Sequence, residues 1–262
     1  MSVMNSTVLI TGASTGIGAV YADRFAKRGH DLILVARNND RLKALADRLH
    51  RQYGVAVDIV QADLTNENDL QKIESRLRDD AGIGILVNNA GSAIAGGFPD
   101  QSASDVTSLI NLNALAVTRL ALAVAPAFIA KGEGAIINIG SVVGYVPEFG
   151  STVYGATKAF VSYLSQSLQS ELGPKGLYVQ AVLPGATRTE IWEHAGKNVH
   201  DLPAVMDVEE LVDAALVGFD RRETMTIPHL PDADQWTSFD AARQAMAPNF
   251  GQTRAATRYR VA

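Results

Sequence analysis

The sequence predicts an α/β protein with a doubly wound, Rossmann-like parallel sheet, in a single domain over residues 1–262. Short apolar segments rich in β-branched residues alternate with longer segments of helical periodicity from residue 7 to about residue 219. The short segments are apolar along nearly their whole length, which is typical of parallel strands that are covered on both faces. The chain contains no Cys, which excludes disulfides, thiolate metal sites and a cysteine nucleophile.

Six strands and seven helices can be assigned in chain order. The expected strands cover residues 7–11, 31–36, 55–61, 83–88, 135–139 and 177–183. The expected helices cover residues 17–28, 40–52, 67–78, 104–131, 151–172, 208–219 and 234–246. Residues 185–206 and the Pro-containing segment 221–262 lack a long regular pattern. We expect the latter to form a C-terminal extension of the domain.

The charge and the N-terminal sequence exclude several partners and locations. A formal net charge of −5 argues against a general nucleic-acid binder, which normally carries a basic patch. The first basic residue is Arg24, so the N-terminus lacks the charged region of a secretory signal. The longest apolar run, residues 120–130, contains Pro126 and is shorter than the roughly 20 residues that span a bilayer. We therefore expect a cytoplasmic protein with neither a membrane nor a nucleic acid as partner.

A glycine-rich turn, residues 11–18 (TGASTGIG), joins the first strand to the first helix. Gly12, Gly16 and Gly18 allow a tight turn, close approach of a phosphate to the backbone, and close packing of the helix on the strand. The helix N-terminus offers free N–H groups to that phosphate. The turn thus predicts dinucleotide binding. The segment also matches G-x-S-x-G, so a serine hydrolase with Ser14 as nucleophile remains an alternative, although an HGGG segment is missing.

The end of the second strand indicates which dinucleotide binds. An acidic residue here would bind the ribose 2′-hydroxyl of NAD, but the sequence has Ala36 followed by Arg37. A guanidinium binds a 2′-phosphate through charge-assisted hydrogen bonds. We therefore expect NADP(H) to be favoured over NAD(H).

Tyr154 and Lys158 are four residues apart and so share one face of the expected helix. A free Tyr has a pKa near 10. The ammonium, with a positively charged nicotinamide nearby, is expected to lower the pKa of Tyr154 by ~2–3 units. Tyr154 would then exchange a proton with a carbonyl oxygen while hydride reaches the carbon. Ser141 follows the fifth strand, at the edge where parallel sheets bind ligands, and its hydroxyl is placed to bond a substrate oxygen.

In their order along the chain, these motifs resemble the short-chain dehydrogenase/reductase family over about residues 5–190. The matching residues are Thr11 to Gly18, Asp63-Leu64, Asn88 to Gly91, Asn113, Ser141, Tyr154 with Lys158, and Pro184-Gly185 followed by Thr189. The resemblance implies reversible hydride transfer between NADP(H) and a small-molecule carbonyl or alcohol. It also places a substrate lid at about residues 185–206, and Trp192 there either lines an apolar pocket or packs the lid.

The resemblance implies a role for each matching residue. Ser141 would orient the substrate carbonyl, Tyr154 would be the general acid or base, Lys158 would bind the nicotinamide ribose, and Asn113 would hold a water in a proton relay. The residues implied in cofactor binding are Gly12, Ser14, Thr15, Gly16, Ile17, Gly18, Arg37, Asp63, Leu64, Asn89, Ala90, Gly91, Tyr154, Lys158, Pro184, Gly185, Thr187 and Thr189. Gly140, Ala116 and Thr15 differ from residues that are common in the family.

Three further expectations concern partners, metals and alternatives. The expected helices at 104–131 and 152–172 are apolar on most sides, and the family commonly forms dimers or tetramers through them, so we expect a homodimer or homotetramer. The histidines, including His194 and His200, show no metal-ligand spacing, so no metal is expected. A non-catalytic protein that senses redox state by binding NADP is a second alternative.

Overall fold

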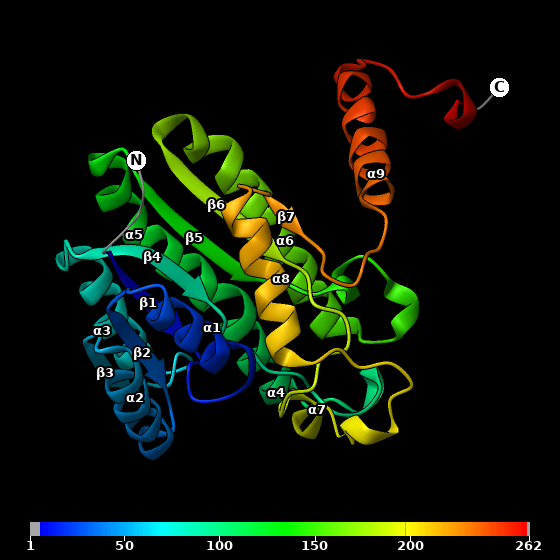
Figure 1. The fold of residues 1–262 in the computed structure, drawn as a ribbon. Helices are drawn as coiled ribbons and strands as arrows, with labels where there is room; N and C mark the ends of the chain where they lie inside the picture. Colours follow the sequence, from blue (N-terminus) through cyan, green and yellow to red (C-terminus); the bar gives the residue numbers. More distant parts are fainter. Residues whose placement is uncertain (1–5, 197, 261–262) are drawn as a thin grey trace. The chain divides into compact units, whose positions relative to one another are not determined.

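The computed structural model describes residues 6–196 and 198–260, and its central element is a seven-stranded parallel sheet (Figure 1). The strands are β1 (Thr7–Thr11), β2 (Leu32–Ala36), β3 (Val57–Gln61), β4 (Ile83–Asn88), β5 (Gly134–Ile139), β6 (Leu177–Val182) and β7 (Met225–Thr226). Their spatial order is β3-β2-β1-β4-β5-β6-β7, and all neighbours are parallel. The chain builds one half of the sheet outward from β1 and then the other half from β4, which confirms the doubly wound fold.

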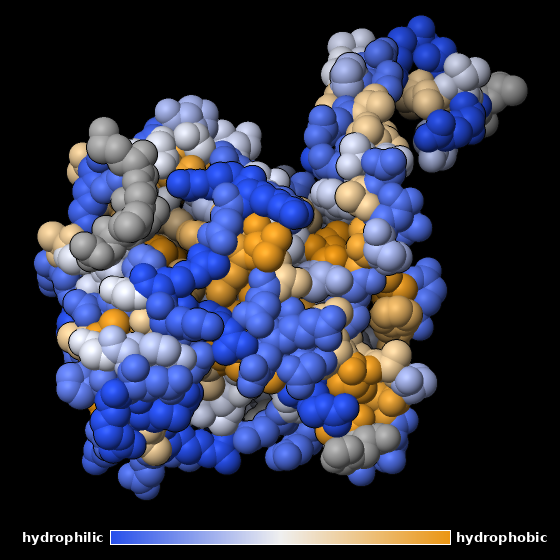
Figure 2. All heavy atoms as spheres, in the orientation of Figure 1, coloured by the Kyte–Doolittle hydropathy of each residue, from blue (hydrophilic) through white to orange (hydrophobic). Residues whose placement is uncertain are grey.

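Helices cover both faces of this sheet. The α-helices of the described residues are α1 (Gly16–Lys27), α2 (Asn39–Tyr53), α3 (Glu67–Asp79), α4 (Ala103–Ile110), α5 (Val117–Lys131), α6 (Thr152–Leu172), α7 (Ile191–His194), α8 (Val208–Asp220) and α9 (Ala233–Met246), of which α9 belongs to a separate unit. Side chains alternate along β1: Val8 and Ile10 join a core with α1, α2 and α8, whereas Leu9 joins a core with α3 and α5. The surface over α2 and α3 is mostly hydrophilic (Figure 2).

The observed elements differ from the sequence pattern in several places, including β7, the short helix α7 and the expected helix 104–131. Two-residue β7 is absent from the expected strands, because so short a segment shows no hydrophobic alternation. The expected helix 104–131 is divided by a π-helical turn, Asn111–Ala116, between α4 and α5. Such turns occur frequently at functional sites, and they leave the helical periodicity of the sequence almost unchanged.

The stretch Ala103–Lys131 is long and apolar enough to cross a membrane, judged by length and composition alone. However, 56% of its most apolar window is buried inside the protein. Leu120, Val124 and Phe128 of α5 lie in the same core as α3 and β5. Packing in the core accounts for the apolar composition of this stretch.

Residues His229–Ala262 form a unit that is separate from residues 1–228. In the described part of this unit, α9 begins after Asp232, whose side chain accepts a hydrogen bond from the backbone of Asp234. Trp236 and Phe239 of α9 contact each other, with ring centres 5.5 Å apart. None of the described residues of this unit is buried. The single-domain boundary of 1–262 remains a prediction.

Candidate active site

A cleft of about 1160 Å³ lies at the carboxyl ends of the strands. It is lined by the segments that follow β1, β2, β3, β4, β5 and β6. Carboxyl ends of parallel strands are where open sheets of this kind bind ligands. The volume exceeds the range of about 300–1,000 Å³ that is typical of a pocket for one small ligand. The cleft is therefore larger than a single small ligand requires.

The glycine turn forms one wall of this cleft. Gly12 and Gly16 have φ values of +64° and +53°, which favour glycine. A Cβ on Gly18 would collide with the Gly12 carbonyl oxygen and lie 2.5 Å from Nδ2 of Asn89. Gly18 itself lies behind the cleft wall, whereas Thr15, Gly16 and Ile17 line it together with Ser14. The N-terminal end of α1 is thus open to an anion in the cleft.

Hydrogen bonds hold the loop after β4 against this turn. Nδ2 of Asn89 donates to the carbonyl oxygens of Thr11 (2.9 Å) and Gly12 (3.1 Å). In return, the Thr11 hydroxyl oxygen accepts from the backbone N–H groups of Asn89 and Ala90, at 3.0 Å each. These bonds fix Asn89, Ala90 and Gly91 along the cleft wall.

Arg37 and Asp63 lie beside the cleft at the ends of β2 and β3. Arg37 is exposed, and its guanidinium forms no hydrogen bond or ion pair with any residue in the described ranges 6–196 and 198–260. Oδ1 of Asp63 accepts hydrogen bonds from the backbone and the hydroxyl of Thr65, at 2.9 and 2.7 Å. Leu64 is buried next to it and also lines the cleft. The Arg37 guanidinium is thus available to an anionic ligand.

Tyr154, Lys158 and Ser141 lie together on another wall of the cleft. Nζ of Lys158 is 5.7 Å from the centre of the Tyr154 ring and donates a 2.9 Å hydrogen bond to the carbonyl of Ile139. The Ser141 hydroxyl is 3.3 Å from the carbonyl oxygen of Pro184 and accepts a hydrogen bond from the backbone of Val143. The structure therefore brings the Tyr, Lys and Ser side chains to one place.

Burial is the main cause of the pKa shifts of Tyr154 and Lys158. It raises the pKa of Tyr154 to about 12, although a hydrogen bond with Ser141 acts in the opposite direction. Burial also lowers the pKa of Lys158 to about 8. The expectation that the pKa of Tyr154 falls below 10 is wrong for the polypeptide by itself. The reason is that removal from water disfavours the phenolate more than the surrounding groups stabilise it.

Asn113 lies behind the cleft wall, in the π-helical turn, and is 1% exposed. Its Oδ1 accepts from the backbone N–H of Ser92, and its Nδ2 donates to the Ser92 carbonyl, both at 3.0 Å. Nδ2 also contacts the Thr157 hydroxyl at 3.2 Å. A Cβ on Gly91 would lie 3.3 Å from Oδ1 of Asn113 and 3.5 Å from Nζ of Lys158. Asn113 thus lies near Lys158, with Gly91 beside both.

The segment after β6 closes the cleft on the remaining side. Pro184, Gly185, Thr187 and Thr189 line it, as does Trp192. The indole N–H of Trp192 donates a 2.8 Å hydrogen bond to the carbonyl of Thr187. Trp192 therefore both packs the segment and lines the cleft.

Metal ligands were not expected from the histidines, and the side chains of His194 and His200 lie outside the described residues. Within the described part of the chain, no cluster of three His, Asp or Glu residues is arranged to hold a metal ion.

Several lining residues carry no sequence signal for a site. Ser92 and Ile94 follow β4, whereas Val143 and Phe149 lie in two short 3-10 helices that follow β5, about 50 residues later in the chain. Arg41 and Glu190, 149 residues apart, form an ion pair at this cleft. Only the fold brings these side chains together, so no motif could have revealed them.

Comparison with known proteins agrees with this architecture. The family model of short chain dehydrogenases matches residues 6–200. A very-long-chain 3-oxoacyl-CoA reductase of Rattus norvegicus is 33% identical over 229 residues, which cover 84% of this chain and 71% of that protein. A serine 3-dehydrogenase of Agrobacterium fabrum is 38% identical over 189 residues, which cover 71% and 74%.

Two solved structures are more similar. A short-chain dehydrogenase from Sphingobium yanoikuyae in complex with NADPH is 63% identical, with a TM-score of 0.96 and coverage of 97% of this chain and 100% of that one. A bulky-bulky ketone specific alcohol dehydrogenase from Comamonas testosteroni is 55% identical, with a TM-score of 0.92 and coverage of 98% and 99%. This chain therefore belongs to the short-chain dehydrogenase family and is an oxidoreductase that acts on CH–OH and C=O groups.

Proposed function

We propose that this chain is an NADP(H)-dependent carbonyl reductase and alcohol dehydrogenase in which Tyr154 is the general acid and base. The observation that carries the proposal is the grouping of Tyr154, Lys158 and Ser141 in a cleft that also contains the glycine turn and the exposed Arg37. The turn fits a dinucleotide because Gly12 and Gly16 adopt the positive φ values of a tight turn and the N-terminal end of α1 opens into the cleft. When bound, the cofactor supplies the hydride that reduces the carbonyl carbon.

Side chains of the protein donate and accept the proton that accompanies hydride transfer. Because the pKa of Tyr154 is about 12, its phenol is protonated at neutral pH and can donate to the carbonyl oxygen. Ser141 contacts Tyr154, so its hydroxyl is placed to hold that same oxygen. The buried ammonium of Lys158 stabilises the phenolate that is left, and Asn113 supports the proton relay behind it. In the oxidative direction the same groups accept the proton.

Arg37 supports a preference for NADP(H) over NAD(H). Its exposed guanidinium lines the cleft at the end of β2, where the ribose of a dinucleotide is bound in folds of this type. The relative from Sphingobium yanoikuyae is bound to NADPH, and a serine dehydrogenase that is 30% identical is complexed with NADP+. A 2′-phosphate in contact with Arg37 would discriminate between the two cofactors.

We propose that the substrates are ketones with two large apolar substituents. The cleft is lined by apolar side chains from the segments that follow β4, β5 and β6, including Ile94, Val143, Phe149 and Trp192. The described charged residues of the cleft are Arg37, Arg41, Asp63, Lys158 and Glu190, and only Lys158 belongs to the Ser–Tyr–Lys group. A carboxylate substrate such as serine would thus find no dedicated cation there, whereas the bulky ketones named for the Comamonas testosteroni enzyme match the apolar lining.

The decisive experiment compares turnover in two variants. The wild type is screened with diaryl and alkyl aryl ketones against NADPH and NADH by nicotinamide absorbance. Tyr154→Phe should abolish turnover and retain NADPH binding. Loss of ester hydrolysis in Ser14→Ala, with hydrolysis spared in Tyr154→Phe, would instead support a hydrolase. NADPH binding without turnover of any carbonyl or alcohol would support a redox sensor.

We further propose a cytoplasmic homodimer or homotetramer that does not associate with membranes. Large apolar side chains on α5 and α6 are exposed, including Leu122 (71%), Phe160 (44%) and Tyr163 (74%). Association of these two helices with a second copy would bury them. Light scattering of the purified protein, with Leu122→Glu as the disrupting variant, tests this assembly.

A further inference from the structure

An ion pair joins the two sides of the cleft. Nη1 of Arg41, on α2, is 2.8 and 3.0 Å from the two carboxylate oxygens of Glu190. Glu190 lies between Thr189 and α7, in the segment that follows β6. Both residues line the cleft. The pair therefore links the side that carries Arg37 to the lid segment, residues 185–206.

Both partners are held by their neighbours. Asn38 caps α2 by accepting a 3.0 Å hydrogen bond from the backbone N–H of Arg41. On the other side, the Thr189 methyl group lies 3.2 Å from the position that a Cβ on Gly16 would occupy. The lid segment thus passes close to the glycine turn directly before Glu190. A dinucleotide that extends from this turn to Arg37 would lie beside the ion pair.

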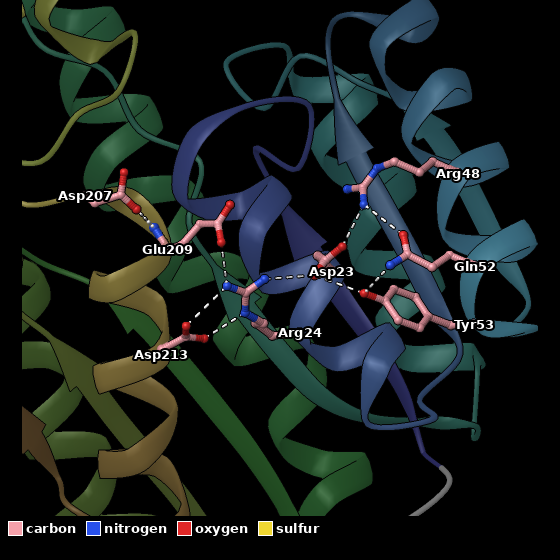
Figure 3. Close-up of polar contacts among 8 residues, drawn as sticks. All are labelled: Asp23, Arg24, Arg48, Gln52, Tyr53, Asp207, Glu209 and Asp213. Atoms are coloured by element: carbon pink, nitrogen blue, oxygen red, sulfur yellow. Dashed lines mark hydrogen bonds and ion pairs between the residues drawn. The ribbon is translucent and has the colours of Figure 1, made fainter.

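The helix that follows the lid segment, α8, is attached to the body of the protein in a different way. Arg24 of α1 binds Glu209 at 2.9 Å and Asp213 at 2.7 Å, both on α8, and also binds Asp23 (Figure 3). The Arg24 side chain is 20% exposed, whereas Arg41 and Glu190 are each 50% exposed. Several partners and partial burial make the α8 attachment persistent. A single exposed pair contributes little to stability and can open.

We propose that the Arg41–Glu190 pair is a clasp that holds the lid segment over bound NADP(H) and thereby limits the rate of cofactor release. The clasp rests on the proposed function, because it requires that the cleft binds this cofactor. Arg41 and Glu190 are positioning residues: their bond to each other holds the lid segment in place beside the cofactor. Opening the clasp changes the dissociation rate more than the association rate, as is usual for contacts formed after encounter.

The test measures dissociation of NADPH and of NADH by stopped-flow fluorescence in wild type, Glu190→Gln and Arg41→Gln. Each variant should release both cofactors about two- to fivefold faster, as expected for loss of one exposed ion pair. The charge exchange Arg41→Glu with Glu190→Arg, measured with NADH, should return the rate to within about twofold of wild type. Salt should accelerate release in wild type more than in Glu190→Gln, because it screens an exposed pair.

A matched control is available on the same protein. Arg28 and Asp220 form an exposed ion pair with two contacts of 2.9 Å between α1 and α8, and neither residue lines the cleft. Arg28→Gln should leave the release of both cofactors unchanged.

Two results would overturn the clasp. If Glu190→Gln releases NADPH at the wild-type rate or more slowly, Arg41 acts alone, as a ligand of the 2′-phosphate. If the double variant Arg41→Glu with Glu190→Arg still releases NADH faster than wild type, the interaction between the two charges is not what retains the cofactor. Absence of NADPH binding to wild type would instead defeat the proposed function, and the clasp with it. If wild type binds NADPH but Glu190→Gln releases it at the wild-type rate, the clasp is wrong and the proposed function still stands.

Discussion

Tyr154 and Lys158 lie one helical turn apart on α6, and the Lys158 ammonium is 5.7 Å from the centre of the Tyr154 ring. The ammonium donates a hydrogen bond to the Ile139 carbonyl at the end of β5, so it is held by the sheet and directed beneath the phenol. In the proposed mechanism this arrangement combines a proton donor with a charge that would stabilise its conjugate base. Four measurements on variants test what these and neighbouring residues do.

Replacing Tyr154 by Phe removes the hydroxyl that would donate the proton and retains the ring. General acid catalysis contributes about 10²–10⁴-fold to rate, so kcat for ketone reduction should fall by about that factor. NADPH affinity, measured by fluorescence titration, should change little. A variant that keeps more than a tenth of wild-type kcat would show that another group supplies the proton.

Lys158 makes the stability of the free protein depend on pH. Below about pH 8 its side chain is charged in both the folded and the unfolded chain, so folding bears the full cost of burying the ammonium. Between about pH 8 and its ordinary pKa of 10.5, the unfolded chain keeps a proton that the folded protein has lost. The free energy of unfolding should therefore rise across this window, by an amount on the order of 3 kcal/mol.

Lys158→Met should remove this rise and be more stable than wild type at pH 7. Urea denaturation at several values between pH 7 and pH 10 provides the measurement. The difference in the free energy of unfolding between wild type and variant reports the titration of Lys158 alone, because the other lysines and tyrosines titrate in both proteins. A constant difference over this range would contradict the shift in the pKa of Lys158.

Arg37→Asp should weaken NADPH binding far more than NADH binding. A charge-assisted hydrogen bond contributes about 1.5–3 kcal/mol, so the dissociation constant for NADPH should rise at least about tenfold. NADH lacks the 2′-phosphate, and its affinity should change by much less. Equal losses for both cofactors, measured by titration, would remove Arg37 from the phosphate site.

Gly18→Ala tests the close approach of α1 to the loop after β4. The added methyl group would overlap the Gly12 carbonyl and crowd Asn89, so the turn would have to open. We expect a loss of NADPH affinity together with a lower melting temperature. Gly251→Ala is the control, because no atom lies within 4 Å of the position of its added Cβ. Equal melting temperatures and affinities for the two variants would argue against a tightly closed turn.

The sequence alone predicted the parallel sheet, because each strand is apolar throughout and each is followed by a helical pattern. It also predicted that Ser141, Tyr154 and Lys158 lie close together, since a strand end and a helical spacing place them, and the structure brings them to one cleft; their roles in catalysis stay predictions. It failed on the pKa of Tyr154, because the degree of burial depends on how distant segments pack. The Arg41–Glu190 pair was equally inaccessible, because a lone Arg and a lone Glu in separate loops form no pattern.

The π-helical turn Asn111–Ala116 has a consequence for redesign. It accommodates more residues per turn than the α-helices on either side, so deleting one residue would let α4 and α5 fuse into one regular helix. Each residue of an α-helix advances by about 100°, so the same deletion would rotate Asn113 away from Ser92 and Thr157. An engineer who straightened this helix for thermal robustness would therefore remove the hydrogen bonds that connect Asn113 to Ser92 and to Thr157, the neighbour of Lys158 in the chain.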